Sequence, residues 1–293
     1  MTTEAPAAAE AIRSAQVADS AGPEAPQLAR PVVWLLPVGA VIGFVGALAG
    51  VGGGLFAMPV LYLVWKLPLK NAVATALALV GVNALVATIT ESLRDDPDIR
   101  WSLVGATVVG TLTGAQFGYR AAKTISTKKL KVMFVIVFPT VALYMVWKTV
   151  ASTGETDVAR EFSALEHVFA TLAGLGGGFL APLLGVGGGI LIVPGLFLMV
   201  GGLGFAGARA CSLAATVVTA SRSAFLHYRD GRVNTTAAGF LSLGALAGGS
   251  FGVRAFHMEG VAIWGKIIFA ATLLFLTLRF LSELRAERSK GAA

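Results

Sequence analysis

Long apolar segments follow one another along the chain and are separated by short polar stretches. They lack the two-residue alternation of barrel strands, and most of them reach the roughly 20 residues that a helix needs to cross a bilayer. The segments cover residues 32–65, 72–93, 101–122, 130–150, 165–201, 205–228, 235–256 and 261–281. This pattern predicts an all-α polytopic membrane protein.

The composition supports this prediction. Of the 293 residues 56% are hydrophobic and 13% are charged, whereas a soluble domain carries about 25% charged residues. Such a chain cannot cover a globule with a polar surface, so a soluble enzyme, a disordered protein and a nucleic-acid binder are poor fits. The net charge of +7 indicates cytoplasmic loops of a membrane protein rather than a nucleic-acid surface. The lone cysteine, Cys211, excludes an internal disulfide.

One glycine-rich motif occurs twice. Gly50-Val51-Gly52-Gly53-Gly54 with Pro59 recurs 135 positions later as Gly185-Val186-Gly187-Gly188-Gly189 with Pro194. Residues 75–78 and 114–121 recur in the same way at 211–214 and 248–255. The chain is therefore expected to hold two copies of one unit. The expected divisions are a disordered tail 1–30, repeat 1 at 32–150, a connector at 151–161, repeat 2 at 162–282 and a cytoplasmic tail at 283–293.

The first segment of each unit is too long for one span. Residues 32–65 would form a helix of about 51 Å, longer than the ~30 Å hydrocarbon core. We expect it to break at the glycines, as a re-entrant hairpin or as paired half-spans, and to be followed by three transmembrane helices. Each unit then makes five passages. Because five is odd, the two units are predicted to be inverted repeats.

The charges of the loops favour the same count. The loop 120–131 carries five Lys or Arg and no acid, which is typical of a cytoplasmic loop. Five passages per unit then place residues 66–70, residues 229–232 and the basic C-terminal tail on the same side. Residues 94–100 and the acidic connector fall outside. The prediction is a cell inner (plasma) membrane protein with N- and C-termini in the cytoplasm and no cleavable signal peptide.

The glycine motifs are the predicted substrate site. Irregular backbone at membrane depth is costly unless it lines a cavity, and its presence in both repeats indicates transport. Glycines with positive φ let successive N–H groups face an anion, and helices beginning near Leu55 and Ile190 would point their positive ends at it. The alternative is that these glycines only permit tight helix crossing. The predicted binding glycines are Gly52, Gly53, Gly54, Gly187, Gly188 and Gly189.

Polar side chains within the spans add candidates. Thr75 and Ser212 are placed near the starts of the next helices as donors to an oxyanion, or alternatively as helix caps. Asn83 and Thr219 correspond at an offset of 136 and are candidates either for the substrate or for interhelical hydrogen bonds. Arg222 can bind an anion, or extend to the headgroups instead.

Two titratable groups are candidates for coupling transport to an ion gradient. Glu91 and His227 lie near helix ends, and H⁺ or Na⁺ is the candidate coupling ion. Arg209 can guide an anion at the outer mouth, but it is expected to be an ordinary interfacial charge. No cofactor, metal site or nucleic-acid partner is expected.

The paired Gly-Val-Gly-Gly-Gly-x4-Pro motifs, each followed by a Thr-Ala-Leu- or Cys-Ser-Leu-type stretch, resemble the sulfite exporter TauE/SafE family over nearly the whole chain after the tail. The resemblance implies a bacterial or archaeal carrier of sulfite, sulfonates or related sulfur compounds. In repeat 2 the hydroxyl of Ser212 stands one position away from that of Thr75 in repeat 1, so the two half-sites are not strictly equivalent.

The function predicted from the sequence is a secondary transporter, not an enzyme. It would move a small anion such as sulfite, thiosulfate or an organosulfonate by alternating access, holding it between the glycine loops. A non-transporting scaffold or sensor subunit is the alternative. An intramembrane enzyme is disfavoured because no catalytic pair lies at mid-span. The expected partners are the anion, the lipid bilayer and a second copy in a homodimer.

Overall fold

The computed structural model describes residues 30–126 and 161–258 continuously, together with parts of 128–143 and 260–285. The predicted N-terminal tail, most of the connector and the end of the C-terminal tail lie outside the described residues. The predicted spans 130–150 and 261–281 are described only in part.

All regular elements of the described chain are helices, and it contains no strand. Three helices begin at the residues that the hydropathy pattern indicates, namely Trp101, Phe205 and Thr235. The helices are α2 (Leu35–Ala49), α3 (Gly54–Pro59), α4 (Leu69–Ser92), α5 (Trp101–Thr124), α7 (Ala164–Leu184), α8 (Gly189–Met199), α9 (Phe205–Arg229) and α10 (Thr235–Phe256). A 3₁₀ turn, η1 (Val32–Trp34), precedes α2, and a π-helical turn, η2 (Val60–Val64), continues α3.

Within the described chain, four helices are long and apolar enough to cross a membrane by length and composition. They are Val32–Ala49, Leu69–Ser92, Ala164–Leu184 and Thr235–Phe256. Large apolar side chains such as Val41, Leu112 and Phe251 are exposed on the outside of the bundle. An apolar exterior of this kind requires lipid as its solvent, so the fold is that of a multi-pass membrane protein.

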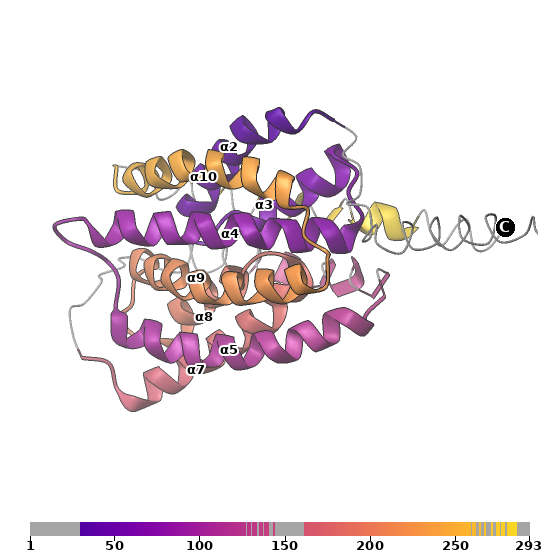
Figure 1. The fold of residues 1–293 in the computed structure, drawn as a ribbon. Coiled ribbons are helices and arrows are strands. Elements are labelled where there is room, and N and C mark those ends of the chain that lie inside the picture. Colours follow the sequence, from indigo (N-terminus) through magenta and orange to yellow (C-terminus); the bar gives the residue numbers. More distant parts are fainter. Residues whose placement is uncertain are drawn as a thin grey trace, which may run out of the picture.

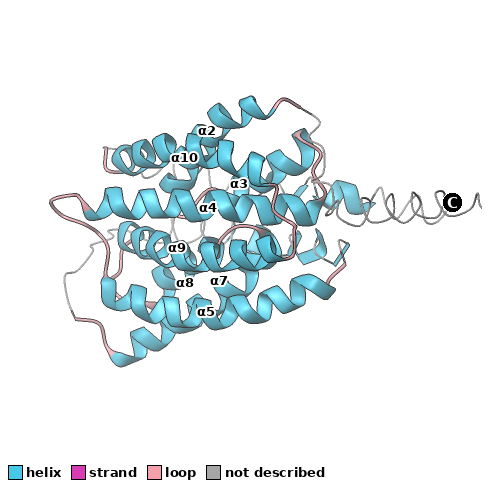
Figure 2. Cartoon of the chain, viewed as in Figure 1, coloured by secondary structure: helices cyan, strands magenta, loops and turns pink. Residues whose placement is uncertain are grey.

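Helices from the first half of the chain pack mainly against helices from the second half. Helices α4 and α9 lie side by side at the centre of the bundle (Figure 1). On one side of this pair α2 packs against α10, and on the other side α5 packs against α7 (Figures 1 and 2). Each of these pairs joins a helix of the first repeat to a helix of the second.

Glycines set the close spacing of the outer pairs. A Cβ atom at Gly114 of α5 would lie 2.2 Å from the carbonyl oxygen of Leu175, and one at Gly248 of α10 would lie 1.9 Å from that of Ala40. The two helix backbones therefore touch, as in small-residue crossings of membrane helices. The neighbouring turns show the same contact, at Gly110, Gly118, Gly244 and Gly252. Many glycines thus do serve close packing, in addition to those of the paired motifs.

The loops predicted to be cytoplasmic meet at one end of the bundle. Asn71 donates a hydrogen bond to the carbonyl of Arg232 at 3.1 Å. Lys123 forms an ion pair with Asp230 at 3.2 Å. Residues that the positive-inside rule groups together are therefore close in space at this end.

Candidate functional site

Each glycine motif forms a turn between two helices. Gly50 caps the end of α2 and α3 begins at Gly54, while Gly185 caps the end of α7 and α8 begins at Gly189. The left-handed φ angles fall on Gly50, Gly52 and Gly53 (75°, 72° and 94°), and the same pattern recurs at Gly185, Gly187 and Gly188 (73°, 76° and 95°). The prediction of positive φ is wrong for Gly54 and Gly189, because they already have the helical conformation of α3 and α8.

The two turns lie directly against each other. A Cβ atom at Gly54 would lie 2.2 Å from the carbonyl oxygen of Gly185, and one at Gly189 would lie 2.9 Å from that of Gly50. Val80 of α4 and Thr216 of α9 pack on both turns. The turns are buried. In this conformation the two turns are in direct contact.

Some backbone donors of the turns have no protein acceptor. The N–H groups of Val51 and Gly52 donate to Gly46 at 3.1 and 3.3 Å and so complete the cap of α2. Within the described chain, the N–H groups that follow, at Gly53, Gly54 and Leu55, donate to no backbone carbonyl, and neither do those of Gly188, Gly189 and Ile190. These first-turn donors are the groups that a bound anion can use.

Asn83 fixes the first turn to α4. Its amide nitrogen donates to the carbonyls of Gly43 at 3.2 Å and Gly52 at 3.1 Å. Its amide oxygen is buried without a hydrogen-bond partner in the described chain, and it faces Gly249. Because both amide hydrogens are used, Asn83 positions the turn. Thr216, which no sequence motif marks, also has a buried hydroxyl without a hydrogen-bond partner in the described chain.

Thr75 and Ser212 do not lie at helix starts as predicted, because α4 begins at Leu69 and α9 at Phe205. The Thr75 hydroxyl accepts a hydrogen bond from the backbone N–H of Asn234 at 3.0 Å. The Ser212 hydroxyl donates to the carbonyl of Gly50 at 3.0 Å and so contacts the first turn.

The true counterpart of Thr75 is Cys211. Its Sγ accepts from the backbone N–H of Arg100 at 3.2 Å. Arg100 precedes α5 as Asn234 precedes α10, so the same contact occurs in both repeats.

The remaining predicted site residues are not brought to the turns. The Thr219 hydroxyl donates to Ala215 of its own helix at 2.9 Å. Arg222 is exposed and donates to the side chain of Gln116 at 3.2 Å. The glycine turns, Asn83 and Ser212 therefore lie together, whereas Arg222 lies on the surface of α9.

Glu91 belongs to an ion-pair cluster at one end of the bundle. Its carboxylate pairs with Arg209 and, at 2.7 Å, with Arg94. His257 Nε2 lies 3.2 Å from the same carboxylate, and Asp98 completes the cluster. Burial and the nearby Glu91 carboxylate raise the pKa of Asp98.

The expectation for Arg209 is wrong. Its side chain is fully buried rather than interfacial, donates to the carbonyl of Ala47 at 3.2 Å and stacks on Phe256. A charged residue near the start of a helix is predicted to lie at the membrane interface. The sequence pattern does not reveal the partner of Arg209, because Glu91 lies 118 positions away.

Glu91, Asp98 and His257 present ligand atoms within 4.8 Å of one another, which is the donor set of a cation site. Glu91 already accepts from the guanidinium groups of Arg209 and Arg94, however. A cation would have to displace charged partners, so the residues fit an internal ion-pair cluster better than a metal centre.

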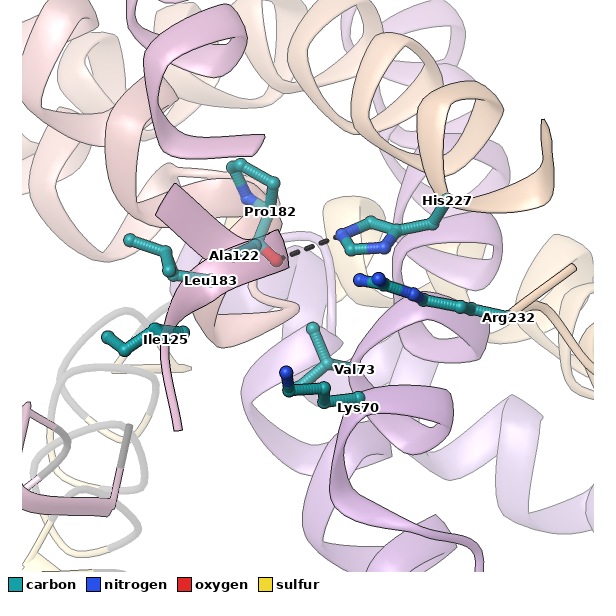
Figure 3. A pocket seen from close by; sticks show the side chains of 8 residues that line it. All are labelled: Lys70, Val73, Ala122, Ile125, Pro182, Leu183, His227 and Arg232. Atoms are coloured by element: carbon teal, nitrogen blue, oxygen red, sulfur yellow. Dashed lines mark hydrogen bonds between the residues drawn. The ribbon is translucent and has the colours of Figure 1, made fainter. Parts of the chain in front are cut away.

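His227 lines a narrow pocket at the opposite end. Its Nε2 lies 3.0 Å from the carbonyl of Pro182. Figure 3 shows its imidazole next to the guanidinium of Arg232, with Lys70 and Val73 also lining the pocket. We refer to this pocket, which none of the acidic residues lines, as the basic pocket.

Comparison with known proteins agrees with the fold. The sulfite exporter TauE/SafE family matches residues 7–149 and 170–292. A "Probable membrane transporter protein" of Xylella fastidiosa is 32% identical over 39% of this chain and 42% of its own length. A protein with the same description from Methanocaldococcus jannaschii is 30% identical over 55% of this chain and 59% of its own length.

The chain thus spans about half the length of the curated relatives that it matches. No solved structure matches it significantly. The family match covers most of the chain, in both repeats. The chain therefore belongs to the sulfite exporter TauE/SafE family.

Proposed function

We propose that the protein is a membrane permease that carries a small anion, such as sulfite, thiosulfate or an organosulfonate, by alternating access between two inverted repeats. The anion is held between the two glycine turns when they separate. The relatives described as membrane transporters and the apolar, multi-pass fold support a transporter. An enzymatic role has no support from the side chains around the turns.

The observation that carries the proposal is the pair of glycine turns in direct contact at the centre of the bundle. Both turns leave first-turn N–H groups without a backbone acceptor in the described chain. Two turns that each carry such donors, and that contact one another through Gly54 and Gly189, suit an anion with several acceptor oxygens.

The direct test is flux. Purified protein in liposomes should take up at least one of four compounds, each supplied with a radiolabel: sulfite, thiosulfate, sulfoacetate or taurine. Gly53→Ala and Gly188→Ala should reduce the rate at least about tenfold. Each adds a Cβ at a φ near +95°, 2.9 Å from Ile42 in one turn and 2.8 Å from Gly177 in the other.

A matched control separates this effect from a general effect of losing glycine. Gly105 and Gly239 also lie in the bundle, but a Cβ there meets no atom within 4 Å. Gly105→Ala and Gly239→Ala should keep wild-type flux. If none of the four anions moves through the wild-type protein, the anion permease is refuted. If the turn variants transport normally, the turns serve packing alone.

A further inference from the structure

The first glycine turn, residues 50–54, and the second glycine turn, residues 185–189, are held differently by the helices around them. Three buried side chains donate hydrogen bonds to carbonyls of the first glycine turn or of the end of α2 that leads into it. They are Asn83 to Gly52 at 3.1 Å, Ser212 to Gly50 at 3.0 Å and Arg209 to Ala47 at 3.2 Å. These donors belong to α4 and α9, so the first glycine turn is fixed to both central helices.

The second glycine turn lacks the equivalent donors. Helices α4 and α9 begin at residues 69 and 205, so corresponding positions differ by 136. The positions that correspond to Asn83, Ser212 and Arg209 are held by Thr219, Ala76 and Val73. Alanine and valine have no donor, and the Thr219 hydroxyl donates to Ala215 of its own helix at 2.9 Å. Within the described chain, the second glycine turn and the end of α7 have one side-chain contact of this kind, between His227 Nε2 and the Pro182 carbonyl at 3.0 Å.

Backbone hydrogen bonds show the same difference. The N–H groups of Val51 and Gly52 donate to the carbonyl of Gly46, whereas the corresponding groups of Val186 and Gly187 donate to no backbone carbonyl in the described chain. The N–H groups without a backbone acceptor therefore cover residues 186–190 in one motif and only 53–55 in the other. Buried donors of this kind are costly, and a segment with few hydrogen bonds opens at low free energy. The second glycine turn is the more easily displaced of the two.

The helix that leads into the second glycine turn is also interrupted. Pro182 lies inside α7, close to Gly185, and has no N–H to donate to the carbonyl one turn earlier. The corresponding residue of α2 is Ala47, which keeps its N–H. Because kinks in helices form at prolines, α7 has a place to bend directly before its glycine turn.

We propose that Asn83, Ser212 and Arg209 are positioning residues that hold the first glycine turn as the fixed half of the substrate site, and that the second glycine turn moves when the site opens, with Pro182 as its hinge. This inference rests on the proposed function, because it states which half of the proposed site moves. The two ends of the motion are therefore not equivalent, although the two turns have the same backbone conformation.

Hydrogen–deuterium exchange of the full chain in neutral detergent tests the proposal without transport. Both turns have the sequence Gly-Val-Gly-Gly-Gly, so the intrinsic exchange rates of their amides are alike and the comparison is internal. The amides of residues 186–189 should exchange at least about tenfold faster than those of residues 51–54. Equal rates, or faster exchange at the first glycine turn, would overturn the proposal.

Removing one donor tests the positioning role. Ser212→Ala should accelerate exchange at residues 51–54 at least about fivefold and leave the rest of α9 unchanged, because it removes one buried hydrogen bond. The matched control is Thr88→Ala, since the Thr88 hydroxyl donates to Ala84 of its own helix at 2.7 Å. This control should change the exchange of neither turn. Unchanged exchange in Ser212→Ala, or an equal acceleration of the whole protein, contradicts a positioning role.

Supplying the missing donors tests the moving half. Ala76→Ser combined with Thr219→Asn gives the second glycine turn the residue types that hold the first, so exchange at residues 186–189 should slow at least about fivefold. Thiosulfate flux should fall by about the same factor in maximal rate, with KM unchanged, because opening is slowed and the anion contacts remain. Wild-type flux in a double variant whose second glycine turn exchanges slowly overturns the proposal. Ser212→Ala removes a single oxygen atom, so the test does not depend on how well the double variant folds.

Flux and exchange together separate this inference from the permease. Faster exchange of the second glycine turn in a protein that transports none of the four anions supports the moving turn and refutes the permease. Transport by a wild-type protein whose two turns exchange equally supports the permease and refutes the moving turn.

Discussion

The ion-pair cluster and the basic pocket occupy corresponding places in the two repeats, yet one is filled and the other is open. The backbone around them is alike, because a carbonyl of the preceding helix is contacted in both, Ala47 by Arg209 and Pro182 by His227. The side chains differ in size and in the sign of their charge. The comparison shows that corresponding carbonyl contacts at the two ends of the bundle go with different side chains.

The largest expected effect is at the ion-pair cluster. Glu91→Gln leaves the fully buried Arg209 without its main counter-charge, which should cost about 3–5 kcal/mol of unfolding free energy. Thermal unfolding in detergent measures it. Glu91→Gln combined with Arg209→Met should recover most of the loss. An unfolding temperature of Glu91→Gln equal to that of the wild type would contradict the importance of this pair.

An intermediate effect is expected when residue types of the ion-pair cluster are introduced at the corresponding positions of the basic pocket. Val73→Arg introduces a guanidinium among Lys70, His227 and Arg232 and should destabilise the protein by about 1–3 kcal/mol. His227→Glu in the same chain should recover at least about 1 kcal/mol, because it supplies the partner that Glu91 gives to Arg209. A double-mutant cycle from thermal unfolding measures this coupling. Additive effects of the two substitutions would show that the ends are not equivalent places.

The smallest expected effect is at the two corresponding hydrogen bonds, which Thr75 and Cys211 accept from backbone N–H groups. Thr75→Val removes the acceptor that the Asn234 N–H uses and should cost about 1 kcal/mol. Cys211→Ala should cost less, because sulfur is the weaker acceptor for the Arg100 N–H. Thr75→Ser retains the hydroxyl and serves as the control. A larger loss of unfolding free energy in Cys211→Ala than in Thr75→Val would break the proposed correspondence of the two contacts.

Hydropathy is sufficient to predict that the described chain is all-helical. The starts of α5, α9 and α10 follow from polar residues next to long apolar runs, and the breaks at Gly50 and Gly185 follow from glycine's access to positive φ. These signals are local, so they can be recognised in the sequence without knowing how the helices pack. The exchange of packing between repeats is not local, since the contact of Gly114 with Leu175 depends on how distant helices dock.

The site was less predictable for the same reason. Glu91 was selected as a titratable group, but its partners Arg209 and His257 come from other helices. The sequence indicates His227 as a titratable group, whereas its place in the basic pocket depends on the small side chains of Val73 and Ala122. An offset of 136 between Glu91 and His227, and between Val73 and Arg209, was available in the sequence as a signal. To interpret this offset one must know that Glu91 contacts Arg209 at one end of the bundle and that Val73 and His227 line one pocket at the other end.

The exchanged packing of α2 with α10 and α5 with α7 has a mechanical consequence. A repeat cannot swing as one rigid body, because its outer helices are bound to the other repeat through bare glycine backbone. The bodies free to move past the central helices are therefore composite, each built from both halves of the sequence. Any motion that separates the two glycine turns therefore carries helices of both repeats together.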